Sequence, residues 1–228
     1  MAVTATGPTA SAALGAVTTV VFDVGETLVR DDRYWGSWAD WLGVPRHTLS
    51  ALVGAVVAQG RDNQEALRLA RPGIDVAAER DRREAAGRGE HLDESDLYED
   101  VRPALAALRD AGFAVHVAGN QTARAGALLR AMELPAETVS TSEEWGCAKP
   151  EAAFFARVLE TTGSAPAATL YVGDHPARDV GPARDAGLRT CHLVRGPWGR
   201  LWAGWDDPPP DLRVTGLREL AKVLTEGR

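Results

Sequence analysis

The stretch that decides the fold is Val17 to Asp23, which reads VTTVVFD and leads into a loop containing Gly25. Its β-branched and aromatic residues form one short apolar run that ends abruptly in a carboxylate. Such a run is typical of a strand of a parallel sheet that is buried on both faces. We therefore expect Val17 to Asp23 to be a buried parallel strand, with Asp23 at its carboxyl end.

Apolar runs of the same kind recur along the chain, and helical patterns separate most of them. The spacing of Val101, Leu105 and Leu108 predicts one such helix, which Gly112 ends. Strands that alternate with helices predict a doubly wound α/β fold, in which helices cover both faces of a parallel sheet. The further strand candidates are Phe113 to Ala118, Thr169 to Val172, Arg189 to Val194 and Leu212 to Val214.

A segment without any strand pattern follows the first strand and delays its crossover helix. Within it, Leu49, Leu52, Val53 and Val56 repeat at helical spacing. This spacing predicts an inserted helical unit. The expected organisation is a flexible tail at 1–16, an α/β core domain built from 17–32 and 99–228, and the helical insertion at 33–98.

Composition and charge narrow the class of partner. Of the 228 residues, 45% are hydrophobic and 25% are charged, which is typical of a globular protein. The net charge of −7 disfavours nucleic acids and anionic membranes, because both require a basic protein surface. A small, anionic molecule is the expected substrate, and the oligomeric state stays open.

Several absences favour a cytoplasmic protein. The two cysteines, Cys147 and Cys191, have no Cys-x-x-Cys spacing and form no disulfide framework. The first residues lack a basic start and a continuous apolar block, so we expect no secretory signal. No apolar stretch reaches the length of about 18 residues that a membrane span requires.

Polar residues gather where the predicted strands end. Asp23, the pair Gly119-Asn120, and Asp174 with Asp179 fall at or just after carboxyl ends of strands. In open parallel sheets, ligands bind beyond these ends. Carboxylates that meet there repel one another, and a divalent cation that prefers oxygen ligands relieves the repulsion, so we expect Mg²⁺ at this edge. Lys149, one of only two lysines in the chain, can balance an anionic substrate at the same edge.

The pattern resembles the haloacid dehalogenase superfamily, whose hydrolases use an aspartate nucleophile. The first family motif, an apolar strand ending in Asp-x-Asp-x-Thr, is similar to VVFDVGETL at 20–28, with Asp23 at the nucleophile position and Thr27 at the threonine position. The lysine motif is similar to Lys149-Pro150. In this family the insertion after the first motif is a substrate-selecting cap, which implies that role for residues 33–98.

The last family motif, Gly-Asp followed by a second acid, is similar to Gly173-Asp174 with Asp179 five residues later. The resemblance implies Asp23 as nucleophile, and a Mg²⁺ site formed by Asp23, the Gly25 carbonyl, Asp174 and Asp179. It also implies that Lys149 steadies the intermediate and that Thr27, Gly119, Asn120 and Lys149 contact the substrate.

The chain departs from the family pattern at two positions. The acid two residues after the nucleophile protonates the leaving oxygen in the family's phosphatases, but Gly25 stands there. General acid–base help contributes about 10²–10⁴ in rate, so substrates with good leaving groups are favoured unless Glu26 or His175 substitutes. The second family motif offers a Ser or Thr hydroxyl to the phosphate, whereas this chain has Gly119-Asn120, so backbone N–H groups, the Asn120 amide or the Thr122 hydroxyl would have to replace it.

Two alternatives to a phosphatase remain open. One is metal-independent hydrolysis of a carbon–halogen bond, because the family's dehalogenases also lack the second acid. Such enzymes are not expected to keep the Asp174 and Asp179 pair. The other is a catalytically weak protein that binds a phosphorylated ligand or a protein partner, with residues 198–205 as a candidate contact surface.

Overall fold

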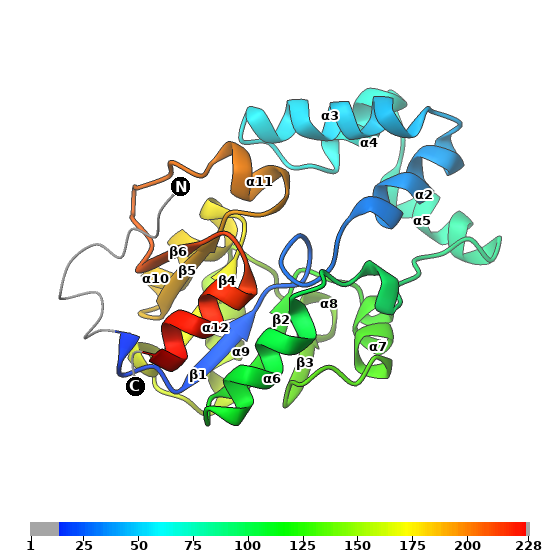
Figure 1. The fold of residues 1–228 in the computed structure, drawn as a ribbon. Coiled ribbons are helices and arrows are strands. Elements are labelled where there is room, and N and C mark those ends of the chain that lie inside the picture. The colour runs from blue at the N-terminus through cyan, green and yellow to red at the C-terminus, as the bar shows by residue number, and fades with distance from the viewer. Residues whose placement is uncertain (1–13, 227–228) are drawn as a thin grey trace.

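The computed structural model describes residues 14–226, and its centre is a parallel sheet of six strands (Figure 1). The strand order is β3-β2-β1-β4-β5-β6, and every neighbouring pair is parallel. This confirms the predicted doubly wound α/β fold, while most of the predicted N-terminal tail lies outside the described residues. The strands are β1 (Thr19–Phe22), β2 (Ala114–Gly119), β3 (Thr138–Thr141), β4 (Thr169–Gly173), β5 (Arg189–Leu193) and β6 (Leu212–Val214).

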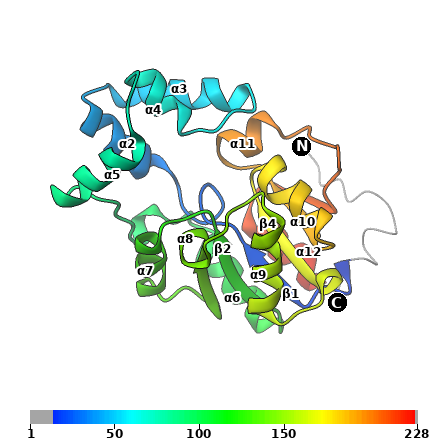
Figure 2. The same cartoon turned by 180° about the vertical axis from the view of Figure 1, so that it is seen from behind.

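Strand β1 lies at the centre of the sheet because its side chains are apolar on both faces. Val20 and Phe22 point into one hydrophobic cluster together with α6 (Val101–Asp110) and α12 (Leu217–Glu226). Val21 points to the opposite face, where it packs with α9 (Ala152–Thr162). Figures 1 and 2 show these helices on opposite sides of the sheet. The sheet therefore excludes water from both faces, as the continuous apolar run predicts.

The remaining core helices are short and connect the strands. The π-helical turn η3 (Pro176–Val180) continues directly into α10 (Gly181–Asp185), so residues 176–185 between β4 and β5 form one short helical segment. These elements are α7 (Ala123–Ala131), α8 (Ser142–Trp145), η2 (Pro166–Ala168), η3 (Pro176–Val180), α10 (Gly181–Asp185) and α11 (Gly196–Leu201).

The segment between β1 and α6 is helical and lies to one side of the sheet (Figure 1). Its own hydrophobic cluster contains Trp35 and Trp38, both buried, and Trp198 of α11 joins this cluster from the core. The Trp202 indole donates a hydrogen bond of 3.0 Å to the Val57 carbonyl. The helical segment is formed by α2 (Asp32–Leu42), α3 (Arg46–Ala58), α4 (Glu65–Ala70), α5 (Val76–Ala85) and η1 (Glu94–Asp96).

One strand was not expected from the sequence, and the lysine motif leads into a turn before the next helix. Strand β3, with the sequence TVST, was not predicted because an edge strand that is only half buried carries no apolar run. Pro150 at the lysine motif favours a helix start, yet α9 begins at Ala152. The chain turns first, since the Glu151 N–H donates a hydrogen bond of 2.8 Å to the Ala148 carbonyl. Between residues 14 and 226, no helix is both long and apolar enough to cross a lipid bilayer.

Candidate active site

The ends of β1 and β4 bring the predicted acids together. Asp23 follows β1 directly, and its N–H donates a hydrogen bond of 2.9 Å to the Val172 carbonyl of β4. Lys149 arrives from the loop before α9, and its Nζ lies 2.6 Å from Asp23 Oδ1 and 2.6 Å from Asp179 Oδ1. All three side chains are buried. The structure thus places a cation between two carboxylates at the carboxyl edge of the sheet.

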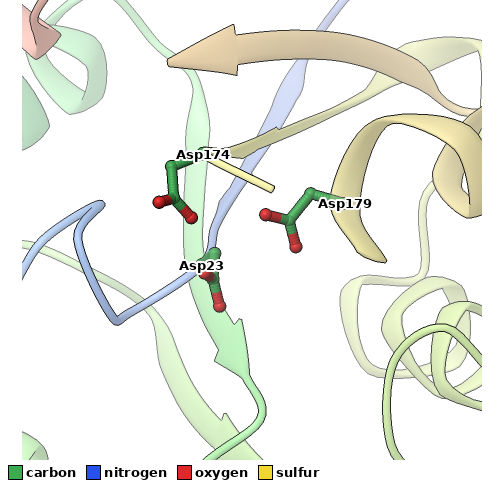
Figure 3. A group of neighbouring side chains, drawn as sticks. All are labelled: Asp23, Asp174 and Asp179. Atoms are coloured by element: carbon green, nitrogen blue, oxygen red, sulfur yellow. The ribbon is translucent and has the colours of Figure 1, made fainter. Parts of the chain in front are cut away.

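Asp174 completes a group of three carboxylates (Figure 3). One oxygen from each of Asp23, Asp174 and Asp179 lies within 4.8 Å of the others. The Asp179 Oδ2 atom accepts a hydrogen bond of 2.9 Å from the His175 N–H, which orients that side chain. Asp174 Oδ2 is buried and has no hydrogen-bond partner. A buried, unpartnered carboxylate oxygen is costly, so the cluster is suited to a bound cation.

Two glycines make room for these carboxylates. A Cβ atom built on Gly119, at the end of β2, would lie 2.7 Å from Asp23 Oδ1. A Cβ on Gly173, at the end of β4, would lie 2.2 Å from Asp179 Oδ2. Real Cβ atoms do not come this close, so each glycine allows a carboxylate to pack against the neighbouring strand end. The structure assigns Gly119 this packing role and does not place it on the cavity wall.

Asn120 holds the lysine loop in place. Its Nδ2 donates a hydrogen bond of 2.9 Å to the Lys149 carbonyl, and its Oδ1 accepts one of 2.8 Å from the Lys149 N–H. The amide therefore binds both backbone groups of one residue, and this fixes the base of the Lys149 side chain. Asn120 also lines the cavity described below.

Burial and mutual repulsion control the charges of the site. Burial raises the pKa of Asp23 to about 6, although the Lys149 ammonium opposes this shift. Burial also raises the pKa of Asp174 well above its usual range, and Asp179 adds repulsion. For Lys149, burial acts against the charged form, but Asp179 and Asp23 outweigh it and hold the pKa well above its ordinary value. The lysine is therefore a permanent cation that stabilises negative charge at Asp23.

A cavity of about 560 Å³ opens over Asp23 and is lined by both the sheet edge and the helical insertion. The core contributes Lys149 and Asp174, and the insertion contributes Trp38 and Arg83. This size accommodates a small molecule.

The two threonines considered in the sequence analysis have other places in the structure. Thr27 is fully buried and lies outside the lining of the cavity. Thr122 lines the cavity, but its hydroxyl donates a hydrogen bond to Glu90 and accepts one from the Ala125 N–H at the start of α7.

Asp31 is a candidate functional residue that sequence reasoning missed. It lies at the start of α2 and lines the cavity beside Gly25, where a built Cβ would lie 3.5 Å from Asp31 Oδ1. Burial, together with the negative charges of Glu26 and Asp23, raises the pKa of Asp31 to about 8. The only sequence signal was an acid soon after the first motif, and no pattern showed that the loop turns back toward Gly25.

The two residues considered as replacements for the missing acid have other contacts. Glu26 accepts a hydrogen bond of 3.0 Å from the Asp31 N–H through Oε1, and its Oε2 accepts one from the Tyr98 hydroxyl. The His175 ring stacks on Trp198 at 3.7 Å, and burial lowers its pKa to about 4. His175 is therefore neutral near pH 7 and has no imidazolium proton to donate.

The donor set fits Mg²⁺, which prefers oxygen ligands and carboxylates in particular. The unpartnered Asp174 Oδ2 and the close approach of three carboxylates both match a hard divalent cation. Asp23, Asp174 and Asp179 are the residues that would hold it.

Comparisons with known proteins identify the family that the chain resembles. The family model for haloacid dehalogenase-like hydrolases matches residues 17–187. A glyceraldehyde 3-phosphate phosphatase of Methanopyrus kandleri is 32% identical over 132 residues, which are 57% of each chain. A phosphoserine phosphatase of Thermus thermophilus is 41% identical over 88 residues, which are 38% of this chain and 34% of that protein. The matched segments thus span less than two thirds of these relatives.

Solved structures share the fold at lower identity. A magnesium-bound structure of the HAD-hydrolase YfnB from Bacillus subtilis has a TM-score of 0.65 at 18% identity, covering 91% of this chain and 98% of that one. The L-2-haloacid dehalogenase of Xanthobacter autotrophicus has a TM-score of 0.58 at 20% identity, covering 91% and 98%. The match to the family model over most of the chain, together with this fold, shows that the protein belongs to the haloacid dehalogenase-like hydrolases.

Proposed function

We propose that the protein is a Mg²⁺-dependent phosphatase of small phosphorylated metabolites, with Asp23 as its nucleophile. The observation that carries this proposal is the position of Asp23, which lies on the cavity wall, hydrogen-bonded to Lys149 and grouped with Asp174 and Asp179. The phosphatase names of the relatives from Methanopyrus kandleri and Thermus thermophilus support it.

In the proposed reaction, the Asp23 carboxylate attacks phosphorus and forms an aspartyl phosphate, which water then hydrolyses. Lys149 balances the negative charge that builds up between the phosphoryl group and Asp23. Asn120 keeps the lysine in place through its two backbone hydrogen bonds. Mg²⁺, when bound to Asp23, Asp174, Asp179 and the Gly25 carbonyl, supplies further positive charge to the phosphoryl oxygens.

We propose that phosphates with good leaving groups are hydrolysed fastest. No side chain at Gly25 is available to protonate the leaving oxygen, and acyl or aryl phosphates release a stable anion that needs no proton. In this proposal residues 33–98 act as the cap that selects the substrate, since Trp38 and Arg83 line the cavity above Asp23. We further propose a cytoplasmic protein that acts on small anionic substrates rather than on nucleic acids or membranes.

The test is hydrolysis of para-nitrophenyl phosphate, acetyl phosphate and alkyl phosphates, with Mg²⁺ or EDTA. We expect turnover that requires Mg²⁺ and is lost in Asp23→Asn, and an aspartyl phosphate that can be trapped by rapid acid quench of the wild type. Glu160→Gln, at an exposed site on α9, is the matched control and should keep full activity. Mg²⁺ binding, measured by calorimetry, should weaken in Asp174→Asn.

Two outcomes would overturn the proposal. Halide release from a 2-haloacid that survives EDTA, without phosphate release, would show the dehalogenase alternative. No turnover of any phosphate, with intact Mg²⁺ binding and a folded protein, would show the binding-protein alternative.

A further inference from the structure

Gly25 leaves a gap in the cavity wall, and the Asp31 carboxyl group borders this gap. A Cβ atom built on Gly25 would lie 3.5 Å from Asp31 Oδ1 and 3.8 Å from Asp31 Oδ2. Side chains that start at Gly25 or at Asp31 therefore reach the same part of the cavity. Asp23, Gly25 and Asp31 all line that cavity.

The backbone of Asp31 is held on both sides. Its N–H donates a hydrogen bond of 3.0 Å to Glu26 Oε1, and its carbonyl accepts one of 2.9 Å from the Trp35 N–H in α2. Glu26 is itself fixed by the Tyr98 hydroxyl. These contacts make Glu26 a positioning residue and keep the Asp31 carboxyl group beside the gap.

We infer that Asp31 is the general acid and base of the phosphatase proposed above, in place of a side chain at Gly25. As the Asp23 oxygen bonds to phosphorus, the bond from phosphorus to the leaving oxygen breaks, and the Asp31 carboxyl proton moves to that oxygen. The Asp31 carboxylate then accepts a proton from the water that attacks the aspartyl phosphate. The electron pair of the cleaved bond returns to Asp23, and phosphate leaves.

The experiment compares kcat for ethyl phosphate, a poor leaving group, with kcat for acetyl phosphate, a good one. In Asp31→Asn we expect kcat for ethyl phosphate to fall about 10²-fold or more, and kcat for acetyl phosphate to fall much less. The control is Asp32→Asn, whose exposed side chain does not line the cavity. Adding Gly25→Asp to Asp31→Asn should restore part of the ethyl phosphate activity.

The outcomes separate this inference from the proposed function. Equal losses with both substrates in Asp31→Asn, or no rescue by Gly25→Asp, would overturn the role of Asp31. A wild type that hydrolyses acetyl phosphate but no alkyl phosphate would also overturn it, while leaving the phosphatase intact. A wild type inactive on every phosphate would instead remove the proposed function itself.

Arg83 of α5 is a buried cation on the opposite wall of the cavity. Its side chain stacks over Trp38 at 4.2 Å, and Nη2 donates a hydrogen bond of 2.7 Å to Ser37 Oγ. The residue is 4% exposed, and Nε is buried without a hydrogen-bond partner. Within residues 14–226, Arg83 forms no ion pair with a carboxylate. Burying an unpaired charge is costly, so a site with such a cation is suited to an anionic ligand.

We propose that Arg83 binds a second anionic group, a carboxylate or a phosphate, on the leaving part of the substrate. This proposal rests on the phosphatase function, because Asp23 must hold the transferred phosphoryl group across the cavity. Arg80 lies three residues earlier on α5 and also lines the cavity, so the same helix face offers two guanidinium groups.

The test uses pairs of substrates that differ only in the second anion. Phosphoserine differs from ethanolamine phosphate by a carboxylate, and ethylene glycol bisphosphate differs from ethyl phosphate by a terminal phosphate ester. In Arg83→Met we expect KM to rise about tenfold or more for the substrate that carries the second anionic group in at least one pair. For the substrate of that pair without the second group, KM should rise less. Arg82→Met, at an exposed position, is the control.

Each pair identifies one anion. A selective KM increase in the first pair indicates a carboxylate, and in the second pair a phosphate. Equal increases of KM within both pairs would overturn the proposal, because Arg83 would then contact the transferred phosphoryl group that all four substrates share. Unchanged KM values would also overturn it, because Arg83 would then only stabilise the packing of the helical insertion. Para-nitrophenyl phosphate turnover by the wild type checks the phosphatase function separately.

Discussion

At the scale of single residues, the site depends on side chains that are absent as much as on those present. Gly119 is the last residue of β2 and Gly173 the last residue of β4, the two strands that flank β1. Each leaves space that a carboxylate of the site occupies. Neither glycine has a positive φ, so backbone conformation does not require it. The reason for each glycine is the close approach of Asp23 or Asp179.

We predict that Gly119→Ala lowers kcat for para-nitrophenyl phosphate at least about tenfold, because the new methyl group displaces Asp23 from its position beside Lys149. The control is Gly54→Ala in α3, where a Cβ meets nothing within 4 Å. That change should leave kcat unaltered and raise the free energy of unfolding by about 0.5–1 kcal/mol. Wild-type kcat in a folded Gly119→Ala protein would contradict this account of the glycine.

At the scale of elements, β2 carries a buried polar residue in its interior. His116 Nδ1 lies 2.9 Å from Thr138 Oγ1 of β3, and its Nε2 is buried without a hydrogen-bond partner. Burial lowers the pKa of His116, although the nearby Glu137 opposes this shift. The neutral ring is therefore part of the packed sheet and lies apart from the active site.

The lowered pKa makes stability depend on pH. In the unfolded chain the pKa of His116 is about 6.5. Below that pH the unfolded chain binds a proton that the folded chain does not, so the free energy of unfolding decreases as the pH is lowered. We predict that His116 alone costs up to about 1.4 kcal/mol between about pH 7.5 and about pH 5.5. Urea unfolding at both pH values measures this loss, which should shrink in His116→Gln but not in His47→Gln, exposed on α3. An equal loss in all three proteins would refute the prediction.

At the scale of the whole molecule, α11 is one of the core elements that contact the helical insertion, and its tryptophans pack directly against it. Trp198 packs into the hydrophobic cluster of the insertion and stacks on His175 of the core. Trp202 bonds to the Val57 carbonyl, and the Arg178 guanidinium pairs with Asp62 across the same boundary. The tryptophan-rich segment therefore connects the two hydrophobic units and shapes the cavity between them.

We predict that Trp198→Ala lowers the free energy of unfolding by about 3 kcal/mol, because it removes a large side chain from a packed cluster. It should also raise KM for phosphate substrates, since Trp198 lines the cavity. Leu201→Ala, 55% exposed on the same helix, is the control and should change stability by less than about 0.5 kcal/mol. A Trp198→Ala protein as stable as the wild type would show that the insertion is held by other contacts.

The sequence alone determined five of the six strands and the four charged residues at the edge of the sheet. A buried parallel strand must be apolar at nearly every position, so runs such as VTTVVFD identify the strands and the positions where they end. Asp23, Lys149, Asp174 and Asp179 follow from those ends and from the family motifs, and the structure brings them together. The helical insertion followed from its 3.6-residue period.

Only the tertiary structure decided which other side chains line the cavity over that edge. Asp31 and Arg83 carry no periodic signal, because a loop's path and a helix's rotation depend on packing between distant segments. The half-buried strand β3 escaped notice because edge positions tolerate polar residues. Hydrophobic period encodes which face of an element is buried, whereas the contacts across the cavity depend on how two separately packed hydrophobic clusters are placed against each other.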